Sequence, residues 1–341
     1  MKKHKFSIFY GITLISFTVY MVLNTFVISS AYQTNAGEAN TSLFEDETET
    51  DLSEESSSDE DTSDDSSSDS DSSSSKGKKG KHSKSSDSDD EDTTTQSSYS
   101  DGVIDTYESD NAEITLTQYT YEDTKIYVAD VTLSSAQYLK TAFAEDTYGK
   151  NVTETTSSMA SSNDAILAIN GDNYGSQESG YVIRNGVVYR DEAGTSDILC
   201  IFADGSMEIY DPDEYSADEL VEMGVWQAFS FGPALVEDGE VVVSEDDEVG
   251  KAKASNPRTA IGMIDELHYL IVVSDGRTDE SEGLSLYELA EFMQELGATT
   301  VYNLDGGGSS TMVFNGTVIN NPTSNGSTIK EREVNDIVYI G

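Results

Sequence analysis

The chain has 341 residues, and its 65 acidic residues against 19 lysines and arginines give a net charge of −46. This charge excludes a nucleic-acid binder, because phosphates would be repelled over most of the surface. The single cysteine, Cys200, excludes an internal disulfide and a cysteine-rich zinc site.

The first segment, residues 1–31, carries three lysines and then no charge over residues 6–31. Such a stretch is long enough to cross a membrane as a helix, and basic residues before it favour a cytoplasmic N-terminus. We therefore predict a single-pass anchor through residues 6–28 that places the rest at the extracellular face of the bacterial cell membrane. The alternative is a cleaved signal peptide, with Ser29 and Ala31 before the cut, and a secreted protein.

Residues 32–101 are of low complexity, with 20 serines among the 50 residues 51–100 and a net charge of −16. A chain with so few large apolar residues cannot offset its ordering entropy, and like charges extend it. This composition predicts a disordered acidic Ser/Asp-rich spacer, with Ca²⁺ binding by the acidic run as an alternative.

Residues 102–341 are predicted to form the folded unit, a single globular domain. Four dipeptides that accept positive φ angles lie between apolar runs, as in tight β-hairpins. They are Asn185-Gly186, Asp204-Gly205, Asp238-Gly239 and Asn315-Gly316.

Further elements follow from apolar periodicity. Strands are expected at 125–131, 165–169, 268–273 and 300–304, the last three central and buried, and helices at 153–161, 217–223 and 286–296. Ser285 with Glu288 forms a capping box for the last helix. The strand–helix–strand order from His268 to Leu304 predicts one parallel pair. The fold class is therefore α+β, with a mixed, mainly antiparallel sheet and a few packed helices.

Arginine is scarce in this unit, which has five among 44 acidic residues. Arg258 follows Asn-Pro, and Arg277 follows Asp-Gly at a strand end. Because arginine binds phosphate or carboxylate in a bidentate manner, we predict functional roles for these two. Arg184, Arg190 and Arg332 are expected to pair with neighbouring acids.

The segment after the strand at 300–304 has the most distinctive chemistry. Asp305 is followed by Gly306, Gly307 and Gly308 and then by hydroxyl residues. Successive glycines let the backbone approach a ligand and direct N–H groups at an anion. We therefore predict an anion-binding loop beside a carboxylate, with a flexible loop without a ligand as the alternative.

Two other strand ends have a similar character. Asn170 and Asp172 follow the strand at 165–169, and Asp275 follows the strand at 268–273. We expect Asn170, Asp275 and Asp305 to share one crevice. Paired carboxylates with an arginine suit the cleavage of a sugar linked to phosphate.

Several segments together resemble the phosphodiester glycosidase family. They are Ile169-Asn170-Gly171, Phe231-Gly232-Pro233, Asn256 to Gly262, Asp275-Gly276-Arg277, Gly283-Leu284-Ser285 with Glu288-Leu289-Ala290, and Asn303 to Ser310. The resemblance covers about 107–340 and implies hydrolysis of the glycosidic bond of a sugar-1-phosphodiester, in bacterial relatives associated with exopolysaccharide or cell-wall glycopolymers. The family usually has a small residue at Asp172 and an aromatic pair at 173–174, so Asp172 is predicted to tune specificity or bind a cation.

The hypothesis for the chemistry is that Arg258 clamps the phosphate and Asp305 acts as nucleophile or as base. Asp275 positions the sugar or serves as the partner carboxylate, Arg277 makes a second phosphate contact or pairs with Asp275, and Asn170 completes the catalytic set. The expected substrate-binding residues are Gly306, Gly307, Gly308, Ser309, Ser310, Arg277, Thr259 and Asp172.

No cofactor is required by this scheme. Asp172, Asp275 and Asp305 are candidate ligands for Ca²⁺ or Mg²⁺. The three histidines, at positions 4, 82 and 268, exclude a histidine-rich zinc site. The expected partners are a phosphate-linked carbohydrate and the membrane. The alternative function is a non-catalytic cell-surface glycan-binding or polysaccharide-assembly protein.

Overall fold

The computed structural model describes residues 33–45, 100–244 and 255–341, together with Leu14. Apart from Leu14, the predicted membrane segment lies outside these residues, as does most of the predicted spacer. Among the described residues, no helix is both long enough and apolar enough to span a membrane.

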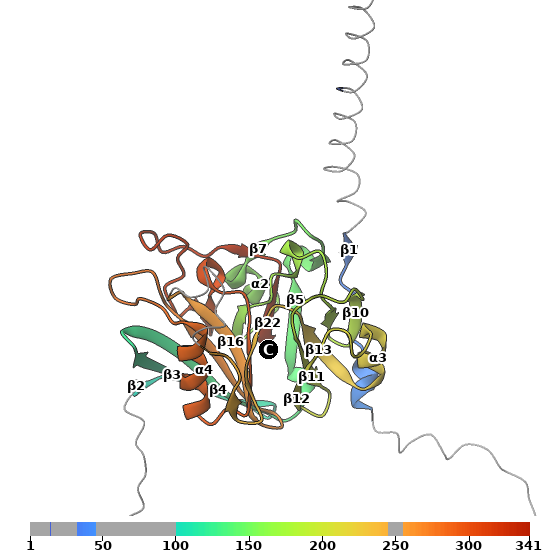
Figure 1. Cartoon of the computed structure of the whole chain (residues 1–341), viewed down its shortest axis with the longest axis horizontal. Helices are drawn as coiled ribbons and strands as arrows, with labels where there is room; N and C mark the ends of the chain where they lie inside the picture. Colours follow the sequence, from blue (N-terminus) through green and yellow to red (C-terminus); the bar gives the residue numbers. More distant parts are fainter. Residues whose placement is uncertain (1–13, 15–32, 46–99, 245–254) are drawn as a thin grey trace, which may run out of the picture. The chain divides into compact units, whose positions relative to one another are not determined.

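The largest element of the structure is an eight-stranded antiparallel sheet (Figure 1). Its order is β15 (Glu240–Val241), β14 (Ala234–Glu237), β18 (Thr300–Asn303), β16 (Arg258–Asp265), β17 (His268–Ser274), β4 (Thr124–Leu133), β3 (Ala112–Tyr121) and β2 (Ser100–Glu108). The predicted parallel pair is wrong: β17 and β18 run in the same direction, but β16 lies between them and pairs antiparallel with both.

Two five-stranded sheets complete the framework. One has the order β20 (Thr317–Val318), β19 (Met312–Phe314), β8 (Leu167–Asn170), β22 (Asp336–Ile340) and β5 (Leu139–Phe143). The other has the order β10 (Val187–Arg190), β9 (Val182–Arg184), β13 (Val225–Phe229), β11 (Ile198–Phe202) and β12 (Met207–Tyr210). Two short pairs join β1 (Thr34–Asn35) to β6 (Thr147–Tyr148) and β7 (Glu154–Thr155) to β21 (Glu333–Val334). The fold is thus mainly antiparallel sheet with few helices, richer in strands than a balanced α+β fold.

The four predicted hairpins are all present. At Asn185-Gly186, Asp238-Gly239 and Asn315-Gly316 both turn residues have positive φ, as two-residue turns of this type require. The turn at Asp204-Gly205 is longer, and only its glycine has positive φ.

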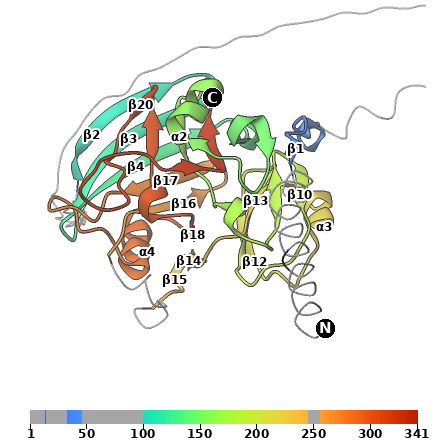
Figure 2. The ribbon, with the colours of Figure 1, turned by 90° about the horizontal axis from the view of Figure 1, so that it is seen from above.

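One central core holds the three large sheets together. Side chains alternate along the strands, so Tyr127 and Ala129 of β4 face this core and Ile126 and Val128 face the opposite layer. Three helices cover the outer faces: α4 (Leu286–Glu295) covers the large sheet, α2 (Thr156–Ser162) covers β8 and β22, and α3 (Ala217–Glu222) covers β9 and β13. In Figures 1 and 2, α4 and α3 lie at opposite sides of this unit.

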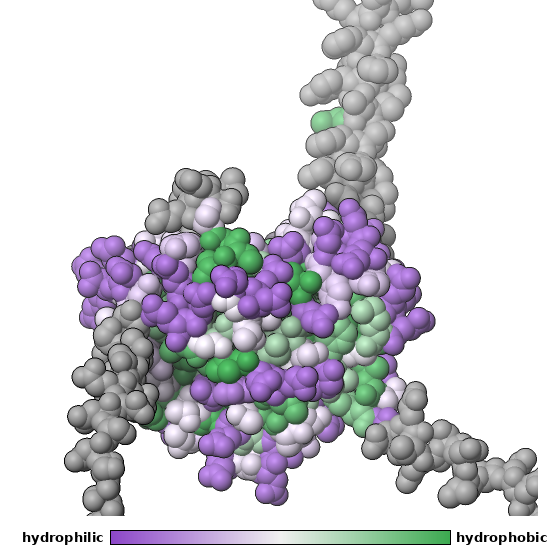
Figure 3. All heavy atoms as spheres, turned by 60° about the horizontal axis from the view of Figure 1, so that its bottom comes forward, coloured by the Kyte–Doolittle hydropathy of each residue, from purple (hydrophilic) through white to green (hydrophobic). Residues whose placement is uncertain are grey.

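The predicted helix signals are confirmed. Ser285 with Glu288 and Ser216 with Glu219 form complete capping boxes at the starts of α4 and α3. The outside of the folded unit mixes hydrophilic residues with hydrophobic patches on the face that Figure 3 shows.

Residues 33–45, which we predicted as part of the spacer, instead pack on the folded unit. β1 pairs with β6, the Asn40 amide donates to the Asn185 carbonyl oxygen at 2.8 Å, and Phe44 contacts the Trp226 ring edge-on at a centroid distance of 5.0 Å. These residues belong to the same compact unit as residues 100–341.

Candidate active site

Three strand ends of the large sheet deliver polar residues to one edge. Arg258 begins β16 and pairs in register with Ser274, the last residue of β17, while Asn303 ends β18 and pairs with Ala260. Asp275 and Asp305 therefore leave the sheet beside the start of β16.

A cavity of about 670 Å³ opens at this edge. Its lining includes three arginines, Arg258, Arg277 and Arg332, together with the backbone of Gly306–Gly308. Phe231 and Pro233 add apolar surface. In a protein of net charge −46, three arginines around one cavity make a local site for an anionic group.

Arg258 and Arg277 are held in place by protein oxygens. The Arg258 Nε donates to the Leu284 carbonyl oxygen at 2.7 Å, and the side chain is largely buried. The Arg277 Nε and Nη2 donate to the Asn256 Oδ1 at 3.1 and 2.8 Å, and its Nη1 donates to the Ser324 carbonyl oxygen at 3.0 Å. These partners of Arg277 are neutral, so they orient its guanidinium without neutralising its charge.

Asp305 lies against the third arginine. Its Oδ2 accepts a hydrogen bond from the Ser309 hydroxyl at 2.6 Å and forms an ion pair with the Arg332 Nη2 at 2.9 Å. Burial raises the pKa of the Asp305 carboxyl, while the Ser309 hydrogen bond and the Arg332 charge oppose that rise. Arg332 pairs with an acid as predicted, but that acid is Asp305 itself, so sequence reasoning missed Arg332 as a site residue.

Asn170 is fully engaged with the protein. Its Nδ2 donates to the carbonyl oxygens of Asp305 at 2.7 Å and Gly171 at 3.1 Å. Its Oδ1 accepts from the Thr259 hydroxyl at 3.0 Å and the Thr311 amide at 3.2 Å. Asn170 therefore fixes the backbone of Asp305. Asn170 and Thr259 are both fully buried, in contrast to the predicted roles in catalysis and substrate binding.

Asp275 also binds protein groups instead of facing the cavity. Its Oδ1 accepts from the Asn321 amide at 2.7 Å, and its Oδ2 accepts from the Asn321 Nδ2 at 3.1 Å and the Tyr127 hydroxyl at 3.4 Å. Burial raises the pKa of the Asp275 carboxyl. Asp275 thus anchors the segment that follows Asn320, and the expected carboxylate pair with Asp305 is not formed at the cavity.

The glycine loop is shaped mainly by close approach of protein groups. Gly307 has a φ of 63°, and its N–H donates to the Pro257 carbonyl oxygen at 2.7 Å. A Cβ added at Gly306 would lie 2.9 Å from the same Pro257 oxygen, and a Cβ added at Gly307 would lie 2.9 Å from the Arg277 Nη2. The Gly307 amide is therefore unavailable to an anion, which corrects the predicted three-amide cradle.

Three residues of the loop region, Asn303, Ser310 and Thr311, keep buried polar atoms without a partner among the described residues. The Asn303 Nδ2 donates to the Gly232 carbonyl oxygen at 2.8 Å, but its buried Oδ1 has no hydrogen-bond partner among the described residues, and Asn303 lines the cavity. The buried Ser310 hydroxyl likewise has no described partner. Sequence reasoning did not single out Asn303, whose position as the last residue of β18 was the available signal.

Asp172 belongs to a buried ion triad. The Arg184 Nη2 contacts the Asp172 Oδ1 at 2.8 Å and the Asp336 Oδ2 at 2.9 Å, and all three side chains are almost inaccessible. Burial raises the pKa of Asp336 to about 7, against the opposing charge of Arg184. Arg184 pairs with acids as predicted, whereas Arg190 donates to backbone carbonyl oxygens of Gly180, Tyr174 and Gln177.

The predicted cation site of Asp172, Asp275 and Asp305 is not formed. Asp172 pairs with Arg184, Asp275 with Asn321, and Asp305 with Arg332. Within residues 33–45, 100–244 and 255–341, no group of three or more histidine, cysteine or acidic side chains is placed to hold a metal ion.

Comparisons with known proteins find a family model and several relatives for this chain. A family model described as phosphodiester glycosidase matches residues 163–341. The chain is 33% identical over 180 residues to the SPbeta prophage-derived uncharacterized protein YomE of Bacillus subtilis, an alignment that covers 51% of this chain and 28% of that protein. It is 32% identical over 128 residues to the mouse N-acetylglucosamine-1-phosphodiester alpha-N-acetylglucosaminidase, covering 38% of this chain and 20% of that enzyme.

A solved structure shows the same fold. The catalytic domain of the zebrafish N-acetylglucosamine-1-phosphodiester alpha-N-acetylglucosaminidase, auto-inhibited by its pro-peptide, superposes with a TM-score of 0.53 at 20% identity. The match covers 67% of this chain and 82% of that domain. The alignments with the curated relatives span less than a third of the length of each.

Proposed function

The chain belongs to the phosphodiester glycosidase family, and from this premise we propose that it hydrolyses the glycosidic bond of sugar-1-phosphodiesters. The observation that carries the proposal is the position of Asp305. Its carboxyl group is bound by Arg332, which lines the same cavity as Arg258 and Arg277. A carboxylate and several guanidiniums at one cavity supply the two things that this reaction needs.

The first requirement is to hold the charge of the departing phosphate. A phosphomonoester has a pKa of about 6, so it leaves readily without protonation by a general acid. What it needs is a counter-charge where the negative charge develops. Arg258 and Arg277 are placed for this, since both line the cavity and both are oriented by protein oxygens.

The second requirement is a group that attacks the anomeric carbon or activates water. Asp305 serves as that nucleophile or base in our scheme. Ser309 and Arg332 fix its Oδ2, and Asn170 fixes its backbone. Because Asp275 is engaged elsewhere, the scheme uses one carboxylate, which is sufficient when the leaving group requires no acid.

We further propose that the protein is exported and acts on cell-surface or exopolysaccharide glycopolymers. The support is the uncharged stretch at 6–31 after three lysines, together with the acidic serine-rich composition that follows. We retain residues 1–31 as the anchor or signal peptide. The folded unit begins at residue 33 in this organisation and excludes the acidic stretch 46–99.

The test is an assay of the full chain on a panel of sugar-1-phosphodiesters, nucleotide sugars included, with free reducing sugar as the readout. We expect release by the parent, loss with Asp305→Asn and a large decrease with Arg258→Lys, because lysine cannot make a bidentate contact. Asp130→Asn is the matched control, since Asp130 pairs with His268 at the surface. Full activity of Asp305→Asn would reject the proposed mechanism. No release from any diester would favour a glycan-binding protein instead.

A further inference from the structure

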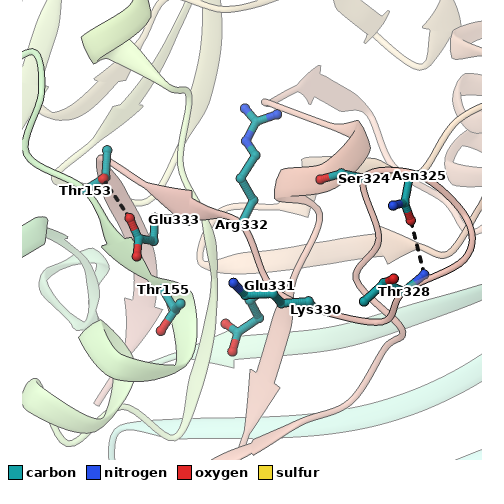
Figure 4. Close-up of a pocket in the computed structure, with 9 residues that line it drawn as sticks. All are labelled: Thr153, Thr155, Ser324, Asn325, Thr328, Lys330, Glu331, Arg332 and Glu333. Atoms are coloured by element: carbon teal, nitrogen blue, oxygen red, sulfur yellow. Dashed lines mark hydrogen bonds between the residues drawn. The ribbon is translucent and has the colours of Figure 1, made fainter.

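A second cavity, of about 590 Å³, lies on the other side of Arg332 (Figure 4). It shares Arg332 and Ser324 with the first cavity, so the two cavities are neighbours. In the view of Figure 4, Arg332 lies between the Thr153–Glu333 hydrogen bond on one side and Ser324 on the other. Arg332 also forms an ion pair with Asp305, so a residue that lines both cavities contacts the proposed reacting carboxylate.

The two cavities differ in their chemistry. Every residue that lines the second cavity has a polar side chain, and hydroxyl and amide groups predominate. Its two glutamates are already bonded: Glu331 accepts from the Ser157 amide and hydroxyl at 2.9 and 2.6 Å, and Glu333 accepts from the Thr153 hydroxyl at 3.3 Å. The first cavity instead combines guanidiniums with apolar surface.

Donors in the second cavity are available to a ligand. Among the described residues, no hydrogen bond uses the hydroxyls of Ser324 and Thr328, and no ion pair or hydrogen bond uses the Lys330 Nζ. Hydroxyls both donate and accept, which matches the hydroxyls of a sugar.

The loop that carries these donors is fixed by its own hydrogen bonds. The Asn325 Oδ1 accepts from the Thr328 amide at 3.1 Å, and the Thr323 hydroxyl donates to the Thr328 carbonyl oxygen at 2.8 Å. Arg277 binds the Ser324 carbonyl oxygen, and Asp275 binds Asn321 at the start of the loop. The backbone that carries these donors is therefore fixed before a ligand binds, which lowers the entropy cost of binding.

We propose that the second cavity is the sugar-binding half of a two-part site, with the phosphate on the Arg258–Arg277 side of Arg332. This inference rests on the proposed function. Each cavity alone is of the size that holds a small ligand, roughly 300 to 1,000 Å³. Together they accommodate a ligand longer than one sugar phosphate, so the substrate class is a phosphate-linked glycan chain that extends across Arg332.

The experiment is calorimetric titration of the full chain with two kinds of probe, inorganic phosphate and a set of free neutral sugars. The sugars are N-acetylglucosamine, N-acetylmannosamine, glucose and galactose. We expect the double variant Thr328→Val/Lys330→Met to weaken sugar binding about tenfold or more and to leave phosphate binding unchanged. Arg258→Gln should do the reverse, since Arg258 lines the first cavity alone and its Nε bonds the Leu284 carbonyl oxygen. Thr132→Val, at an exposed position of β4, is the matched control and should change neither.

Three outcomes would overturn the inference: no saturable binding of any of the four sugars, sugar affinity unchanged in the double variant, or phosphate affinity lost in the double variant. The turnover assay separates this result from the proposed function. Sugar binding that depends on Thr328 and Lys330 without hydrolysis of any diester would reject the enzyme and leave the sugar site standing. Hydrolysis with unchanged sugar affinity in the double variant would reject the sugar site alone.

Discussion

Replacing Asn170 with alanine tests whether this buried amide holds the Asp305 backbone. The change removes bonds to the Asp305 carbonyl oxygen at 2.7 Å, the Thr259 hydroxyl at 3.0 Å and the Thr311 amide at 3.2 Å. Each buried group left without its partner costs about 1–3 kcal/mol, and local relaxation recovers part of the sum. We therefore expect a loss of about 3–4 kcal/mol in the free energy of unfolding, a large part of the total for a typical domain.

The assay is urea denaturation followed by the fluorescence of Trp226, the only tryptophan, which is buried in the folded unit. Thr259→Val is the graded control, because it removes only the bond from the Thr259 hydroxyl and leaves Asn170 bonded to Asp305, Gly171 and Thr311. It should cost about 1 kcal/mol. If Asn170→Ala destabilised the protein no more than Thr259→Val, the positioning role of Asn170 would be refuted.

Three further predictions concern a proton, a buried charge and a turn. Ser309→Ala removes a hydrogen bond that lowers the pKa of Asp305, so the acid limb of the pH–rate profile should move to higher pH. An unmoved limb would contradict a base or nucleophile at Asp305. Since the pKa of Asp336 is raised from 3.8 to about 7, its contribution to stability is present below about pH 4 and lost as the pH rises to 7. The free energy of unfolding in urea should therefore fall between pH 4 and pH 7, by no more than about 4 kcal/mol in total, and Asp336→Asn should lack this fall. Equal pH dependence in the parent and in Asp336→Asn would refute the reasoning. Gly326→Ala should lower the free energy of unfolding by about 1–3 kcal/mol more than Gly316→Ala. Both glycines have positive φ, but only a Cβ at Gly326 would collide with backbone, at the Arg277 carbonyl oxygen. Equal losses would contradict the tight packing of that loop.

Features of the fold that depend on neighbours along the chain were predictable. The Asn-Gly and Asp-Gly turns and the Ser285–Glu288 capping box each rest on a few consecutive residues, and all of them form. The order of strands does not have a local signal. The pattern from His268 to Leu304 indicated the directions of β17 and β18 correctly, but it did not reveal that β16 inserts between them.

The site shows the same difference between features set by neighbouring residues and features set by distant ones. Residue types at strand ends led to Arg258, which lines the cavity, and to Asp305, whose carboxyl group pairs with the cavity-lining Arg332. What each polar group binds depends on residues far away in the sequence, such as Asn321 for Asp275 and Arg332 for Asp305. The sequence therefore identified Asp275 as a polar residue at the edge of the sheet where the cavity lies, but not as an anchor for a loop.

The docking of residues 33–45 has a topological consequence for the acidic serine-rich stretch 46–99. The described residues on either side of that stretch, Glu45 and the first residue of β2, belong to one folded unit, so residues 33–45 are held to the rest of the unit by contacts and not only by the chain between them. A protease cut within residues 46–99 would leave two polypeptides joined by the β1–β6 pairing and by the contact of Phe44 with Trp226. Such a nicked protein would run as one species in native electrophoresis and as two after denaturation.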